Sequence, residues 1–120
     1  MAFYTPEEKT QLLANNNAGL AARITEADHD PMPVIKLFLP GTEMTWLITE
    51  LDDESGEDEI VFGLCDLGFG TPELGYVSLA ELRELKSRSG LSVEKDQGFK
   101  GDKSLSAYTA EANMRGMIVA

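Results

Sequence analysis

The sequence lacks a second cysteine, contains a single histidine, and has no lysine or arginine between residues 37 and 82. A lone Cys65 cannot close an internal disulfide, and with only His29 there is no Cys and His cluster of the kind that holds zinc. We therefore expect a reducing, cytoplasmic location, and no metal or other cofactor.

Long apolar runs are also missing. No stretch approaches the about 20 apolar residues that a membrane-spanning helix needs. Residues 1–10 contain neither the basic segment nor the apolar run of a secretory signal. We expect a soluble protein that does not associate with membranes.

What the sequence has in excess is negative charge. Its net charge of −11 comes entirely from residues 37–82, because acids and bases balance over the rest of the chain. Such a block repels nucleic acid and attracts basic protein surfaces. The candidate partner-binding residues are the seven acids between residues 50 and 59: Glu50, Asp52, Asp53, Glu54, Glu57, Asp58 and Glu59.

The pattern of elements predicts one α+β domain over residues 1–120, with about three helices and an antiparallel meander of three to five strands. Residues 34–39, 44–51 and 60–67 are rich in β-branched, leucine or aromatic side chains and are bounded by turn formers. The third of these is apolar on both faces, which predicts a central strand. Shorter strands are expected at residues 74–77 and 91–95.

Capping patterns predict the helices. Thr5 and Glu8 form a capping box for a helix that we expect to end near Asn15, because an asparagine run and Gly19 follow. Ser78 begins a second helix, which we expect to reach Gly90 and to pair Glu84 with Arg88. A last helix is expected over residues 105–115, with Gly116 ending it.

The acidic segment by itself is too dilute to imitate DNA. Seven carboxylates on an extended chain give one charge per about 5 Å, against one per about 1.7 Å in duplex DNA. A mimic would need Glu43, Asp66, Glu73 and Glu81 on the same surface, or a second copy of the protein. The alternative is a solvated hairpin loop that keeps the protein soluble.

Other candidate chemistries are weaker. The acids lack the alternating spacing and the glycine of a calcium-binding loop, and the glycines around Gly68 match no phosphate-binding fingerprint.

His29 lies between Asp28 and Asp30, and a carboxylate could orient it as a base, but no serine or threonine stands in a recognisable nucleophile motif. We expect Cys65 to be a buried structural thiol, with its pKa raised by the neighbouring carboxylate of Asp66.

Trp46 falls in the middle of a predicted strand, and it has two interpretations. Tryptophan is enriched at binding hot spots, so an exposed Trp46 would suggest a partner surface. The mid-strand position favours a core residue instead.

Several strings of this chain, in order and spacing, resemble an uncharacterised bacterial family, catalogued as domain of unknown function twenty-nine fifty-eight. They are KLF at 36–38, TWLITEL at 45–51, FGLCDLG at 62–68, PELGYVSL at 72–79 and DKSLSAY at 102–108. The resemblance implies no reaction and no site residues. It does imply a setting, since members are encoded largely on plasmids, phages and conjugative elements, often near anti-restriction genes.

Three functions remain open. The first is a non-enzymatic protein of a mobile genetic element that blocks a basic, nucleic-acid-binding surface of a host defence protein, of the anti-restriction or anti-CRISPR type. The second is an accessory interaction module for replication or transfer of the element, acting through the sheet surface and its aromatic residues. The third is a small enzyme that depends on a divalent cation.

Overall fold

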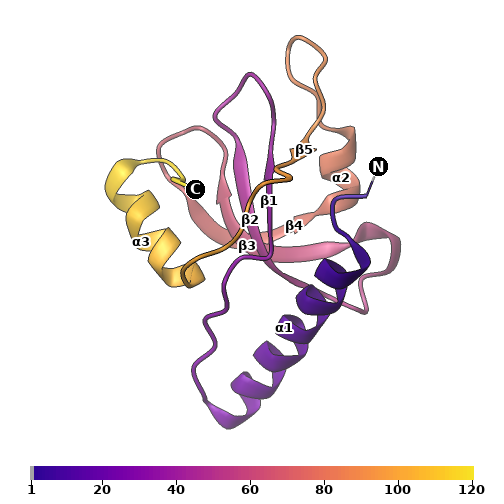
Figure 1. Ribbon diagram of the computed structural model, residues 1–120, viewed down its shortest axis with the longest axis vertical. Coiled ribbons are helices and arrows are strands. Elements are labelled where there is room, and N and C mark those ends of the chain that lie inside the picture. The colour runs from indigo at the N-terminus through magenta and orange to yellow at the C-terminus, as the bar shows by residue number, and fades with distance from the viewer. Residues whose placement is uncertain (1) are drawn as a thin grey trace.

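The computed structural model describes residues 2–120 as an open antiparallel sheet with helices on both faces (Figure 1). The spatial order of the strands is β4-β3-β2-β1-β5. The fold is α+β, as the sequence predicts. The strands are β1 (Ile35–Phe38), β2 (Thr45–Leu51), β3 (Ile60–Asp66), β4 (Glu73–Ser78) and β5 (Glu94–Lys95). The helices are α1 (Pro6–Thr25), α2 (Leu79–Glu84) and α3 (Leu105–Arg115), and a 3-10 turn, η1, covers Gly56–Asp58.

Two apolar cores lie on opposite faces of the sheet, as the two apolar faces of β3 predict. One core joins α1 and α2 to the sheet and contains Trp46, which is 2% exposed, so the core interpretation of this residue is confirmed. The other core joins α3 to Leu47 and Leu64. Leu67, expected at the end of the third strand, lies beyond β3 and is exposed.

Helix α1 is ten residues longer than predicted at its C-terminal end. The Thr5 capping box is present, but the helix passes through Asn15 and Gly19 and ends at Thr25. The amide of Asn15 donates to the backbone oxygen of Thr49 at 2.9 Å, and Gly19 is buried. The breaker prediction was wrong because tertiary contacts compensate for the low helix propensity of these residues.

Helix α2 is shorter than predicted, ending at Glu84 instead of near Gly90. Ser87 diverts the chain, because its backbone N–H donates to Leu91 O at 2.8 Å and its hydroxyl accepts from Leu91 N at 3.0 Å. These local bonds compete with the helix and make a tight turn instead. The expected pairing of Glu84 with Arg88 along one helix face is therefore wrong.

The predicted positions of the last helix and the last strand are close to the observed ones. Helix α3 has the predicted bounds, and Gly116 ends it in a left-handed conformation with φ of 72°. Strand β5 is confined to Glu94–Lys95, so the predicted strand over residues 91–95 was too long.

Candidate functional site

The acidic loop between β2 and β3 is held in place by hydrogen bonds. Ser55 Oγ donates to Asp52 O at 2.6 Å and accepts from Ile60 N at 3.0 Å. Ser78 Oγ, at the start of α2, donates to Asp58 O at 2.9 Å. The loop therefore presents its side chains from a fixed backbone.

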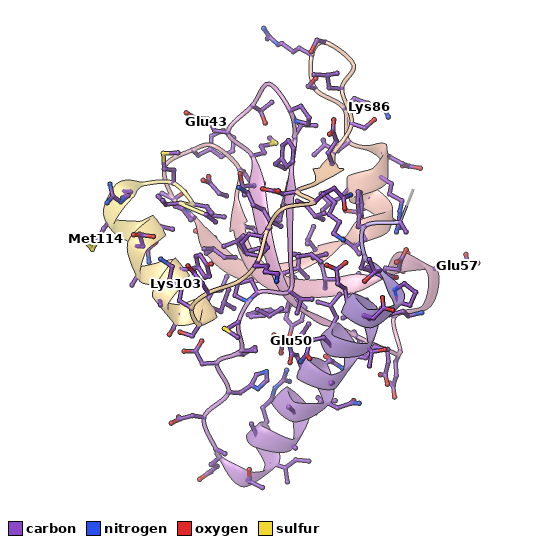
Figure 2. All side chains as sticks on the ribbon, viewed as in Figure 1. Glu43, Glu50, Glu57, Lys86, Lys103 and Met114 are labelled. Carbon is purple, nitrogen blue, oxygen red and sulfur yellow. The ribbon has the colours of Figure 1, made fainter. Side chains whose placement is uncertain are left out.

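The seven predicted partner-binding residues do not share one environment. Asp53, Glu54, Glu57 and Asp58 are exposed, whereas Asp52 is half-buried and accepts a hydrogen bond from Glu54 N at 3.0 Å. Figure 2 shows Glu57 directed outward, away from the body of the molecule. Within residues 2–120, none of the four exposed acids forms an ion pair.

Glu59 is engaged inside the protein. It pairs with Arg83, whose Nη1 lies 2.5 Å from Glu59 Oε1, and it accepts a hydrogen bond from the hydroxyl of Tyr4. Burial alone would raise the pKa of Glu59, but the hydrogen bonds from Arg83 and Tyr4 outweigh it and hold that pKa below its usual value. Glu59 is therefore already satisfied and contributes little to an exposed acidic surface.

The four additional acids that a DNA mimic would need do not converge. Asp66 is 2% exposed and accepts hydrogen bonds from Gly68 N and Ile118 N. Glu43 and Glu73 lie at the opposite end of the sheet from the loop, next to the start of β2 and the end of β3. Only Glu81 lies near the loop, because α2 begins against η1.

We call the exposed group at this end of the sheet the acidic end. Its members are Asp53, Glu54, Glu57, Asp58 and Glu81.

The seventh predicted residue, Glu50, points into a cleft on the other side of the strand end. A β-bulge at Thr49 places it there, because Ile48 faces Gly63 and Glu50 faces the next residue, Phe62. If Thr49 were paired and every residue of β2 alternated strictly, Glu50 would face the core that contains Trp46 and Leu51 would face the cleft. The bulge keeps Leu51 buried and aims Glu50 at the cleft.

The Glu50 carboxylate has two partners in the cleft. Its Oε1 lies 3.1 Å from His29 Nε2, and its Oε2 accepts a 2.6 Å hydrogen bond from Thr49 Oγ1. The side chain of Glu50 is only 12% exposed. The carboxylate that orients His29 is therefore Glu50, not Asp28 or Asp30. His29 and Glu50 are 21 positions apart, so the sequence pattern does not indicate this pairing.

The cleft is an open hollow of about 820 Å³. One wall is the C-terminal half of α1, where Gly19 allows a close approach, since a Cβ there would lie 3.0 Å from both Glu50 Oε1 and His29 Nε2. The opposite wall is aromatic, with Phe62 and Tyr76 packed edge to face at 5.0 Å. The charged and titratable residues of the lining are Arg23, Glu26, Asp28, His29, Asp30 and Glu50.

Asp30 fixes the floor of the cleft to α3. Its carboxylate accepts hydrogen bonds from both the backbone N–H and the hydroxyl of Ser106. These two bonds hold the pKa of Asp30 below its usual value. Pro31 O also accepts from Leu105 N at 2.9 Å, so the segment that carries His29 is tied to the first turn of α3.

Cys65 shows no sign of activation as a nucleophile. Burial raises the pKa of its thiol to about 11, in the predicted direction, although the cause is burial and not the adjacent Asp66. Among residues 2–120, no three His, Cys, Asp or Glu side chains are grouped so that they could hold a metal ion.

These features define an α+β protein with two candidate binding surfaces, an exposed acidic end and a polar cleft with an aromatic wall. The chain belongs to the family described as Protein of unknown function (DUF2958), whose model matches residues 3–119. No curated protein and no solved structure matches the chain. No helix within residues 2–120 has the length and apolar character required to cross a membrane.

Proposed function

We propose that this protein is a non-enzymatic, cytoplasmic binding protein of a mobile genetic element. In this proposal its acidic end occupies a basic surface on a host defence protein, a surface that otherwise binds DNA or RNA. Competition with the nucleic acid gives the inhibition, so no chemical step is required.

The observation that carries the proposal is the set of exposed acids without ion pairs on a fixed loop. Asp53, Glu54, Glu57 and Asp58 lie within six consecutive positions, and Glu81 adds a further charge from α2. A basic partner surface would pair with charges that nothing within residues 2–120 neutralises. Because the backbone is already held by Ser55 and Ser78, little ordering entropy is lost on binding.

The position of the acids also argues against mimicry of a long duplex. Asp66 is buried and Glu43 lies at the far end of the sheet, so the acidic stripe is short. In this proposal the acidic end therefore covers a small basic patch on the partner, and electrostatic steering increases the association rate.

The test is a capture experiment from nuclease-treated bacterial lysate, at low and high salt. The acidic-end variant carries Glu54→Gln, Glu57→Gln and Asp58→Asn. The matched control carries Glu43→Gln, Glu73→Gln and Glu94→Gln, which remove the same charge from the opposite end of the sheet. Captured proteins are identified by mass spectrometry, and their nucleic-acid binding is measured with and without the protein.

We expect a nucleic-acid-binding defence protein to be captured at low salt by the native protein and the control, and lost with the acidic-end variant. Its DNA or RNA binding should fall only when the native protein or the control is added. Equal capture by all three proteins would overturn the proposal and direct attention to the sheet and its aromatic residues.

A further inference from the structure

We propose that the cleft is a binding site for an organic cation, that is, a guanidinium or alkylammonium group. The proposal concerns a different surface from the acidic end and does not depend on the function proposed above. The cation is either a small molecule or the side chain of an arginine or lysine in a peptide, and the experiment below separates these sources.

The charge of the lining sets the sign of the ligand. Four carboxylates, from Glu26, Asp28, Asp30 and Glu50, face a single guanidinium, that of Arg23. The balance stays negative even when His29 is protonated. A phosphate or carboxylate ligand would be repelled by this lining, whereas a cation would be attracted.

Glu50 supplies the central acceptor. Each carboxylate oxygen has two lone pairs, and the contacts with His29 and Thr49 occupy one on each oxygen. The remaining lone pairs are available to the N–H groups of a ligand. Because the side chain of Glu50 is only 12% exposed, a charge-assisted hydrogen bond to it is less weakened by water than one at the acidic end.

The aromatic wall favours a planar or alkylated cation over a hydrated metal ion. Tyr76 is 64% exposed, although its ring packs against Phe62. An exposed tyrosine face attracts a guanidinium or ammonium group by a cation–π interaction. The neighbouring side chain of Leu74 is exposed as well and offers an apolar contact for the alkyl part of the ligand.

Arg23 shows that this wall accommodates a guanidinium. Its Nη2 lies 3.5 Å from Tyr76 Oη, and both residues line the cleft together with Glu50. Arg23 is exposed, so its side chain changes rotamer rapidly and is readily displaced. It acts as an internal competitor for an incoming cation. Removal of the Arg23 guanidinium should therefore strengthen cation binding.

The hollow of about 820 Å³ is large enough for either source of the cation. It lies within the range of about 300–1,000 Å³ that is usual for small-molecule sites. Its open side would also admit an arginine carried on a peptide.

The experiment measures dissociation constants by isothermal titration calorimetry with two probes, agmatine and the peptide acetyl-Gly-Arg-Gly-amide. Citrate is the anionic control ligand. Glu50→Gln and Glu54→Gln make the same chemical change in the cleft and in the acidic loop. Tyr76→Leu tests the aromatic wall at an exposed position, and Arg23→Gln removes the internal competitor.

We expect saturable binding of at least one cationic probe, and none of citrate. Glu50→Gln should weaken binding about tenfold or more, the effect of one charge-assisted hydrogen bond, and Glu54→Gln less than about twofold. Arg23→Gln should strengthen binding, and Tyr76→Leu should weaken it. Comparable affinities for agmatine and the peptide would indicate a small-molecule site, and a clear preference for the peptide would indicate a protein ligand.

Absence of saturable binding of both cationic probes would overturn the proposal. So would equal effects of Glu50→Gln and Glu54→Gln, or a weakening by Arg23→Gln, which would indicate an anion site. Thermal unfolding by circular dichroism reports whether Glu50→Gln is folded. If it is not, the exposed variants Tyr76→Leu and Arg23→Gln decide the outcome.

Discussion

Glu59 is the acid whose role changes most between sequence and structure. It lies in a run of acids, yet it forms an ion pair with Arg83 and accepts a hydrogen bond from Tyr4. Burial and the hydrogen bond to Glu59 raise the pKa of Tyr4 to about 12. The interaction connects the segment before α1, the acidic loop and α2.

We predict that Glu59→Gln lowers the free energy of unfolding near pH 7 by about 1–2 kcal/mol, as expected when a hydrogen bond to a charged group is lost. Because the pKa of Glu59 is depressed from 4.5 in the folded state, its stabilising effect is complete above pH 4.5 and is lost as the pH falls through the folded-state value. The difference between native protein and variant should therefore shrink in acid.

Urea unfolding followed by circular dichroism, from neutral pH to about pH 3, measures this difference. Glu57→Gln is the control, because Glu57 is exposed and forms no ion pair within residues 2–120. A difference between native protein and Glu59→Gln that stays constant over the whole pH range would contradict the argument.

At the scale of elements, the pairing of β2 with β3 depends on Gly63. A Cβ at this position would lie 1.9 Å from the backbone oxygen of Leu47. The close approach is next to the bulge at Thr49, where the register of the two strands shifts. Since the opposing atom belongs to the backbone, it cannot move away as a flexible side chain would.

We predict that Gly63→Ala destabilises the protein by about 3 kcal/mol or more, as for other severe strain in a core. Gly75→Ala is a matched control, because Gly75 pairs with Gly63 in the sheet and has no atom within 4 Å of an added Cβ. Thermal unfolding of the two variants is the measurement. Equal melting temperatures would show that the strands adjust without cost.

Elements with strong local signals could be predicted from the sequence. Helix α3 has the bounds that its apolar pattern and Gly116 predict, about residues 105–115. The far end of α1 was not predicted, because Asn15 and Gly19 have low helix propensity, whereas in the structure Asn15 donates to Thr49 O and Gly19 is buried at a point where a side chain would not fit. Sequence patterns report the helix propensity of each residue but not its tertiary contacts.

The candidate site was predicted only in part, for the same reason. The acids of the loop are visible in the sequence, but the bulge that turns Glu50 into the cleft is not. The sequence offers His29 as a candidate base, but its partner Glu50 lies 21 positions away, in β2. Aromatic residues 62 and 76 form one wall only because β3 and β4 pair in this register.

At the scale of the whole molecule, the charge is strongly uneven. The acids of residues 37–82, from which the net charge of −11 comes, are divided between the acidic end, the cleft and the far end of the sheet, where Asp66 is buried. Two bases from elsewhere in the chain, Lys9 and Arg83, act on Glu59, and none of the ion pairs within residues 2–120 involves the exposed acids of the loop. The exposed acids of the loop therefore repel one another in the folded state.

We predict that the variant Glu54→Gln, Glu57→Gln, Asp58→Asn raises the melting temperature by about 2–4 °C at about 10 mM salt, where the Debye length of about 30 Å leaves the repulsion unscreened. The difference should vanish near 1 M salt. The control variant at Glu43, Glu73 and Glu94 should show a smaller rise, because these acids lie on separate segments. A difference that persists at 1 M salt would show that the effect is not electrostatic.

The bulge at Thr49 also constrains how this protein can change during evolution. The bulge determines which of two neighbouring side chains is buried in the core: Leu51 lies in the core and Glu50 lines the cleft. A substitution that removed the bulge without deleting a residue would exchange them, exposing a leucine and burying a carboxylate in one event. Lineages that keep the fold at this point must therefore also keep the geometry of the cleft.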